Sequence, residues 1–161
     1  MLFYSITGAL TVLACGIELS RRLNRAADRE LCEADKYVAL LRYIRVQIDC
    51  FALPISEILK RADRELLEGC GWSDEIPPES LYLLFTRADA CAKDGKIQRI
   101  LLEFCEDFGK SYLEDQIRRC DDFISLLLER RAVLANELSS KKKLNSTLCI
   151  SGSLALIILL I

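Results

Sequence analysis

The stretch LNRAADRELCEADKYVALLRYIRVQIDCF (residues 23–51) carries its apolar residues at intervals of three and four. That spacing puts them on one stripe of an α-helix, which repeats about every 3.6 residues. We expect the helix to end before Pro54, because proline cannot donate the helical hydrogen bond and disfavours helix in the residue before it. The stripe comprises Leu23, Ala27, Leu31, Ala34, Val38, Leu41, Ile44, Ile48 and Phe51.

Two further helices are expected between Pro54 and Asp94-Gly95. The first starts near Ile55 and continues to Gly69, and the second starts near Glu79 and stops at Asp94. Residues 72–78, which include two adjacent prolines, form an irregular connector between them. The inward residues of the first are Ile55, Ile58, Leu59, Ala62 and Leu66, and those of the second are Leu81, Leu84, Phe85, Ala88 and Ala92.

The last two amphipathic segments complete the predicted bundle. One has its stripe at Ile97, Ile100, Leu101, Phe104 and Phe108, and Gly109 follows as the natural left-handed cap. The other runs without interruption from Leu113 toward the C-terminus, with apolar residues at 113, 117, 120, 124, 127, 134 and 138. Arg131 interrupts this stripe, so we expect it near an edge of the bundle, or with its charged end reaching out to water. No strand-like alternation occurs, and the sequence predicts an all-α antiparallel helical bundle.

Both ends of the chain are apolar. The 161 residues include 22 Lys and Arg and 24 Asp and Glu, and apart from Glu18 all of these lie between Arg21 and Lys143. A stretch of about 18 apolar residues is just long enough to cross a bilayer as a helix. The sequence therefore predicts an N-terminal transmembrane helix (1–19), a cytoplasmic helical bundle (20–143) and a C-terminal transmembrane helix (144–161).

Basic residues flank both predicted membrane helices on the side of the central domain. Positive charge beside a membrane segment favours the cytoplasmic side, so we expect a two-pass protein of the cell membrane with its central domain in the cytoplasm. The alternative for residues 1–19, a cleaved signal peptide, is disfavoured because no basic region precedes the apolar run. The topology-setting residues are Arg21, Arg22, Arg25, Lys141, Lys142 and Lys143.

The composition argues against most kinds of catalysis. The chain has no His, and its net charge of −2 does not favour nucleic acid as a partner. The eight Cys are widely spaced without a CxxC pair, which indicates small buried apolar residues rather than a metal or redox site. Gly109-Lys110-Ser111 lacks the upstream glycine of a phosphate-binding loop. We therefore expect no enzyme activity and no cofactor.

Several motifs occur in a characteristic order along the chain. They are the anchor before Arg21-Arg22, residues 41–48, residues 53–59, Phe108-Gly109-Lys110-Ser111 with Asp115-Gln116, and the lysines before the terminal helix. In their order and spacing the chain resembles the stage III sporulation protein AB family of endospore-forming bacteria. The chain departs from the family pattern after Lys110, where Tyr112-Leu113-Glu114 replaces a Leu-Gly pair and a slightly longer turn.

The resemblance implies a non-enzymatic platform in the secretion-like channel between mother cell and forespore, needed for sporulation after engulfment. The family's cytoplasmic domain is similar to that of the inner-membrane platform proteins of type II secretion and type IV pili. The implied location is the mother-cell side of the outer forespore membrane. The implied partners are a cytoplasmic ATPase and membrane ring subunits, together with the lipid bilayer. If the turn after Gly109 docks a partner, the resemblance places contacts at Lys110, Asp115 and Gln116.

Two points stay open at the level of sequence. Trp72, a large aromatic residue in the connector, is a candidate interaction residue, or else it folds back onto the bundle core. The long periodicity of residues 23–51 also fits a different function, a membrane-anchored adaptor or sensor that dimerises through coiled-coil-like stalks. We favour packing within one chain, because four other amphipathic segments can cover the stripe; self-association is left open.

Overall fold

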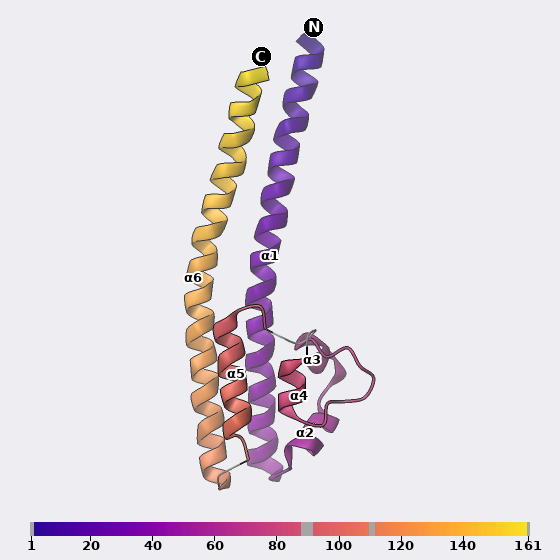
Figure 1. The fold of residues 1–161 in the computed structure, drawn as a ribbon, viewed down its shortest axis with the longest axis vertical. Coiled ribbons are helices and arrows are strands. Elements are labelled where there is room, and N and C mark those ends of the chain that lie inside the picture. Colours follow the sequence, from indigo (N-terminus) through magenta and orange to yellow (C-terminus); the bar gives the residue numbers. More distant parts are fainter. Residues whose placement is uncertain (1, 88–91, 110–111, 161) are drawn as a thin grey trace. The chain divides into compact units, whose positions relative to one another are not determined.

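The computed structural model describes residues 2–87, 92–109 and 112–160, without the side chains of 2–7, 9, 10, 12, 13, 26, 27, 156, 157, 159 and 160. Helices are the only regular elements in these ranges, which confirms the predicted all-α class (Figure 1). In chain order they are α1 (Leu2–Phe51), α2 (Ile55–Arg61), α3 (Arg64–Gly69), α4 (Leu81–Thr86), α5 (Gly95–Asp107) and α6 (Leu113–Leu160).

The chain divides into two compact units, which are considered one at a time. The first consists of residues 1–29 and 134–161, and the second of residues 30–133. The long helices α1 and α6 contribute to both units. Both boundaries lie inside the predicted central domain of 20–143.

In the second unit, α1 and α6 run antiparallel and are joined by ion pairs. Arg45 pairs with Asp121, and Asp35 pairs with Arg131. The two ion pairs are separated by the same number of residues on α1 as on α6, so both are formed in a single packing register of the two helices. The side chains of Arg131 and Asp35 are half-exposed, which confirms that Arg131 lies at an edge of the bundle.

The predicted stripe of α1 forms much of the core of this unit. Its residues from Ala34 to Ile48 are buried, whereas Phe51 is exposed. Tyr37 and Leu40 are also buried, although the stripe left them out. The buried face is wider than predicted because other elements cover α1 as well. Tyr37 meets Phe85 of α4 edge to face, and the Cys70 thiol donates to the Lys36 carbonyl.

The predicted single helix from Ile55 to Gly69 is wrong, because the chain forms two short helices there. Ala62, the C-cap of α2, is extended with ψ 139°, and Asp63 is the N-cap of α3. This break changes which residues face the core. Leu66, predicted to face inward, is only half-buried, whereas Leu67, which the predicted stripe did not include, is buried.

The next predicted helix is shorter than expected over its described residues. It begins after Ser80, whose hydroxyl accepts a hydrogen bond from the Leu83 amide at 3.2 Å, and it ends at Thr86. Ala88, predicted to face inward, lies outside the described residues. Ala92 is buried, as predicted.

The boundaries of α5 and α6 follow the sequence closely. Asp94 caps α5 by accepting hydrogen bonds from the amides of Lys96 and Ile97. Gly109 has φ +81° just beyond the end of α5, which confirms the predicted left-handed cap. α6 is continuous from Leu113 to Leu160, as its periodicity predicted.

In the first unit, α1 and α6 approach closely at Gly16. A Cβ atom added there would lie 2.1 Å from Ser153 Oγ and 3.2 Å from the Cys149 carbonyl oxygen. Lys142 forms an ion pair with Asp28. Over the part of the chain that the structure describes, no helix is both long and apolar enough to cross a membrane.

Candidate functional site

Two turns of the second unit, far apart in sequence, line one cavity of about 440 Å³. One turn joins α1 to α2 and contains Ala52, Leu53 and Pro54. The other follows α5 and contributes Phe108 and Gly109. The walls are largely apolar, and Gln116 is the polar side chain among them. The cavity residues are Ile48, Ala52, Leu53, Pro54, Ile55, Phe108, Gly109, Leu113 and Gln116.

The turn after α1 holds a non-glycine residue in a left-handed conformation. Ala52 has φ 49°, and its amide donates to the Ile48 carbonyl at 2.9 Å. For an alanine this conformation costs about 1 kcal/mol. Pro54 then takes the extended position that begins α2, with φ −68° and ψ 151°. The result is a sharp turn that brings Leu53 and Ile55 to the cavity.

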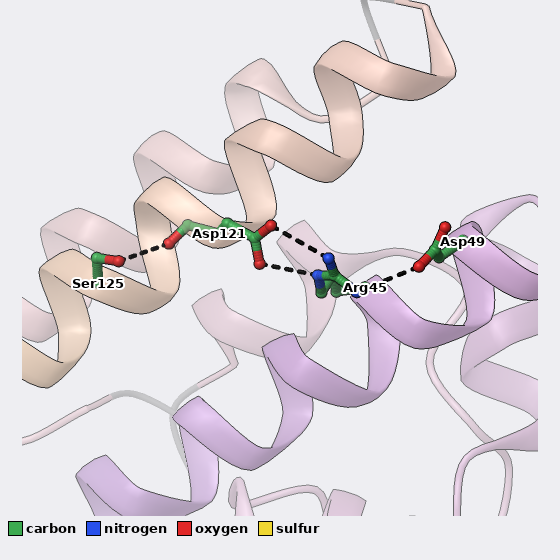
Figure 2. A network of polar contacts seen from close by, with 4 residues as sticks. All are labelled: Arg45, Asp49, Asp121 and Ser125. Carbon is green, nitrogen blue, oxygen red and sulfur yellow. Dashed lines mark hydrogen bonds and ion pairs between the residues drawn. The ribbon is translucent and has the colours of Figure 1, made fainter.

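A polar network fixes the two long helices next to the cavity (Figure 2). Arg45 Nε donates to Asp121 Oδ1 at 2.8 Å, and its Nη2 donates to Asp121 Oδ2 at 3.3 Å. The same guanidinium reaches Asp49 Oδ2 at 3.2 Å, and Asp121 accepts a hydrogen bond from the Ser125 hydroxyl through its backbone carbonyl. These contacts hold α1 and α6 together about one turn from Ile48 and Gln116.

Large apolar side chains are exposed at the same turns. Phe51 is 61% exposed and Tyr112 is 89% exposed, and Leu113 is exposed as well as lining the cavity. An apolar cavity beside exposed aromatic residues is typical of a surface that binds another protein. We call the cavity together with Phe51 and Tyr112 the turn surface.

The structure gathers several motifs that sequence reasoning had singled out separately. Residues 53–55, Phe108-Gly109 and Gln116 all line the cavity. Asp115 is half-buried beside Gln116, and it pairs with Arg118 at 3.3 Å. Lys110 lies outside the described residues. Sequence reasoning missed Phe51 and Leu113 as surface residues, because the periodic stripe assigned both to the core.

Trp72 is placed in the core of the connector and not on its surface. Its indole nitrogen donates to the Ile76 carbonyl at 2.9 Å, and the ring is buried. The Arg87 guanidinium lies over the ring, 4.8 Å from its centre, and pairs with Asp74. Of the two sequence interpretations, folding back onto the core is therefore the one that the structure supports.

The residues predicted to set the membrane topology belong to the first unit. Arg21 and Arg22 are exposed and lie 4.0 and 3.7 Å from the Glu18 carboxylate. Arg25, Lys141 and Lys143 are also exposed. Many large apolar residues of this unit are exposed too: Ile17, Leu19, Leu23, Leu144, Leu148, Ile150, Leu154 and Ile158.

The cysteines do not form one class. Cys70 and Cys120 are buried, as the sequence predicted, whereas Cys15, Cys32 and Cys50 are exposed. Burial raises the pKa of the Cys70 and Cys105 thiols to about 12 and that of Cys120 to about 11. Among the side chains that the structure describes, no cluster of His, Cys, Asp or Glu could hold a metal ion.

The difference between cysteines predicts a pattern of thiol labelling. At pH 8 a maleimide should modify Cys32 and Cys50 at least about 100-fold faster than Cys70, Cys105 and Cys120, because the thiolate is the reacting species and burial suppresses it. Peptide mapping by mass spectrometry after timed labelling measures the rates, and labelling in denaturant should remove the difference. Equal rates for Cys70 and Cys32 in the folded protein would contradict the prediction.

Comparisons with protein-family models, curated proteins and solved structures found no match to this chain.

Proposed function

We propose that this protein is a non-enzymatic, membrane-anchored platform that docks a cytoplasmic partner on its turn surface. The observation that carries the proposal is the shared cavity of the two turns, beside exposed Phe51 and Tyr112. Buried apolar cores with few charges are typical of protein interfaces, and binding residues concentrate on turns carried by a rigid scaffold. Arg45 and its two aspartates supply that rigidity here.

Membrane anchoring through residues 1–19 and 144–161 is part of the proposal. It is supported by the exposed apolar residues of the first unit, because such side chains are stable when lipid covers them. The basic residues at 21–25 and 141–143 support a cytoplasmic central domain. Helices without a break would also carry displacement from a membrane partner, which a flexible linker would not.

The system that we propose is the stage III channel between mother cell and forespore, on the basis of the family resemblance. In this role the turn surface binds the cytoplasmic ATPase, and the anchors contact the membrane ring subunits. The alternative of a dimerising stalk is less well supported. The α1 stripe from Ala34 to Ile48 is buried within a single chain and offers no free seam there.

Deletion of the gene in its native host tests the proposal. We expect heat-resistant spores to be lost, with arrest after engulfment, and the intact gene to restore them. A version without residues 144–161 should fail to restore them, and so should one with several glycines inserted between Ser140 and Lys141 that still reaches the membrane. Normal sporulation of the deletion strain would overturn the sporulation role.

A substitution on the turn surface tests the docking role separately. Leu113→Asp places a charge in the wall of the apolar cavity, so it should abolish complementation. Because Leu113 is already exposed, the protein should still fold and its level should stay normal. Tyr82→Asp is the control, because Tyr82 is exposed on α4 and is not among the residues that line the cavity. Full complementation by Leu113→Asp would remove the turn surface from the function.

A further inference from the structure

The first unit ties α1 to α6 at two heights. At one height Gly16 lies against Cys149 and Ser153, and at the other Asp28 pairs with Lys142. Positions 16 and 28 are 12 residues apart, which is about 18 Å along a helix. Both helices are continuous between the two heights, so this interval of α1 lies beside the matching interval of α6.

The basic residues that flank the two apolar ends of the chain come together in this interval. Arg21, Arg22 and Arg25 of α1 lie between the two heights, and residues 141–143 of α6 lie at the height of Asp28. Successive residues of a helix point about 100° apart, so these side chains spread around the unit and do not form a single patch. We call these six residues the basic belt.

Half of the basic belt carries charge that nothing in the unit neutralises. Arg25, Lys141 and Lys143 are exposed, and none of them forms an ion pair with a side chain that the structure describes. Exposed cations without a carboxylate partner are available to an anionic ligand at little desolvation cost within the protein.

The other half of the belt is neutralised only in part. Arg21 and Arg22 share one carboxylate, that of Glu18, at 4.0 and 3.7 Å, and their side chains are 68% and 76% exposed. Lys142 has a carboxylate of its own, that of Asp28. Two carboxylates therefore face six cations, and the belt presents net positive charge to its surroundings.

Large apolar side chains are exposed at the same height as the basic belt. Leu19 and Leu23 on α1 and Leu144 and Leu148 on α6 all lie between the two tied heights, and all four are exposed. A nucleic acid would pair the cations but would leave these side chains in water. The interface of a bilayer satisfies both, because lipid phosphates there lie beside the ends of the acyl chains.

We propose that the basic belt binds the headgroup phosphates of anionic phospholipids and so fixes the depth of the first unit in the bilayer. The inference rests on the proposed membrane anchoring and names the lipid class that the anchor uses. Beyond the belt, residues 144–160 of α6 extend for about 26 Å, close to the thickness of the hydrocarbon core. Arg21 and Arg22 reach the phosphates by extending their long side chains toward the surface.

Lipid retention by the purified full chain tests the inference. The protein is equilibrated in detergent with equal amounts of phosphatidylglycerol and phosphatidylcholine of the same acyl chains and purified again, and mass spectrometry counts the lipids that it keeps. We expect phosphatidylglycerol to exceed phosphatidylcholine by about tenfold or more. The belt variant, Arg25→Gln with Lys141→Gln and Lys143→Gln, should lower this ratio to about twofold or less, although it breaks no ion pair of the described structure.

Two control variants separate the belt from net charge and from side-chain shape. Arg42→Gln with Lys60→Gln and Lys96→Gln removes the same charge from exposed positions of the second unit, and it should keep the wild-type ratio. The charge-conserving exchange of Arg25 to Lys and of residues 141 and 143 to Arg should keep it as well. An unchanged ratio in the belt variant, or an equal fall in the second-unit control, would refute the assignment to the belt.

The source of the phosphate and the anchoring itself have their own readouts. Inorganic phosphate should not displace the retained lipid, and displacement would show a site for free phosphate in place of a headgroup. Resistance to alkaline carbonate extraction from native membranes measures anchoring alone. If the wild-type chain resists extraction but keeps both lipids equally, the anchoring stands and only the lipid class is wrong. If carbonate extracts the wild-type chain, both proposals fail.

Discussion

Asp94→Ala is expected to destabilise the second unit by about 2–4 kcal/mol, because it removes both a charge-assisted hydrogen-bonded pair and the cap of α5. Asp94 Oδ2 lies 2.6 Å from Arg130 Nη2, and its Oδ1 accepts from Arg130 Nε at 3.2 Å. The side chains of Arg130 and Asp94 are only 11% and 13% exposed. The substitution would leave the largely shielded Arg130 guanidinium without this carboxylate, and it would also remove the cap of α5.

Urea unfolding of the purified full chain in detergent measures this loss. Trp72 is the only tryptophan and is buried in the second unit, so its fluorescence reports on that unit. Asp94→Asn keeps a capping oxygen and removes only the charge, so its loss should be smaller than that of Asp94→Ala.

The neighbouring arginine provides a matched control. Arg131 pairs with Asp35 at 2.9 Å, but these side chains are 42% and 51% exposed. Exposed pairs contribute about 0–1 kcal/mol, so Asp35→Ala should have little effect. If Asp35→Ala and Asp94→Ala lowered the free energy of unfolding equally, shielding from solvent would not explain the contribution of the Asp94–Arg130 pair to stability.

The same pair makes the second unit sensitive to acid. The hydrogen bond from Arg130 lowers the pKa of Asp94 below the ordinary aspartate value of about 3.9. A lowered folded-state pKa means that the stabilisation is complete above that ordinary value and is lost as the pH falls through the folded-state pKa. Between pH 6 and pH 3, stability should therefore fall more in the wild-type chain than in Asp94→Asn.

Gly16→Leu is expected to separate α1 from α6 in the first unit, at a cost of about 1–3 kcal/mol. A Cβ atom at Gly16 would lie 2.1 Å from Ser153 Oγ and 3.2 Å from the backbone oxygen of Cys149. The serine hydroxyl is itself held by a 2.7 Å hydrogen bond to the Cys149 carbonyl, so it cannot move away freely.

Crosslinking between Cys15 and Cys149, which line one cavity with Gly16, measures the separation. A short thiol crosslinker should give a yield about tenfold lower in Gly16→Leu, the factor that about 1.4 kcal/mol represents. Gly8→Leu is the control, because Gly8 is exposed, is not among the residues that line this cavity, and a Cβ there meets nothing within 4 Å. Gly16→Ala should also lower the yield, and Ser153→Ala should restore it by removing the Oγ. An unchanged yield in Gly16→Leu would refute the close approach.

The spacing of apolar residues and the helix-ending residues were sufficient to predict the long helices and where they end. The periodicity of residues 34–48 identified the buried face of α1, and the stripe from Cys120 to Leu138 correctly marked buried positions on α6. Gly109 marked the end of α5, because only glycine takes a positive φ without strain. These features depend on residues within one or two helical turns of each other, and such residues can be identified directly from their spacing in the sequence.

The candidate site was only partly predictable. Residues 53–55, Phe108-Gly109 and Gln116 each stood out in the sequence, but nothing there indicated that they line one cavity. Phe51 and Leu113 fit the apolar stripes and were assigned to the core, although both are exposed. Periodicity identifies the face of a helix on which a residue lies, but it does not state how far along the helix the covering elements extend.

By itself, the sequence determined that this chain is helical, where its long helices lie and which of their faces are apolar, because these properties follow from the regular spacing of side chains along one helix. Only the tertiary structure decided that the Arg130 side chain is largely shielded and that of Arg131 half-exposed, that Trp72 lies in the core, and that two distant turns meet. Each of these depends on a partner far away in the chain, such as Asp94 for Arg130. Such partners come together only when the helices pack, so no local sequence pattern predicts them.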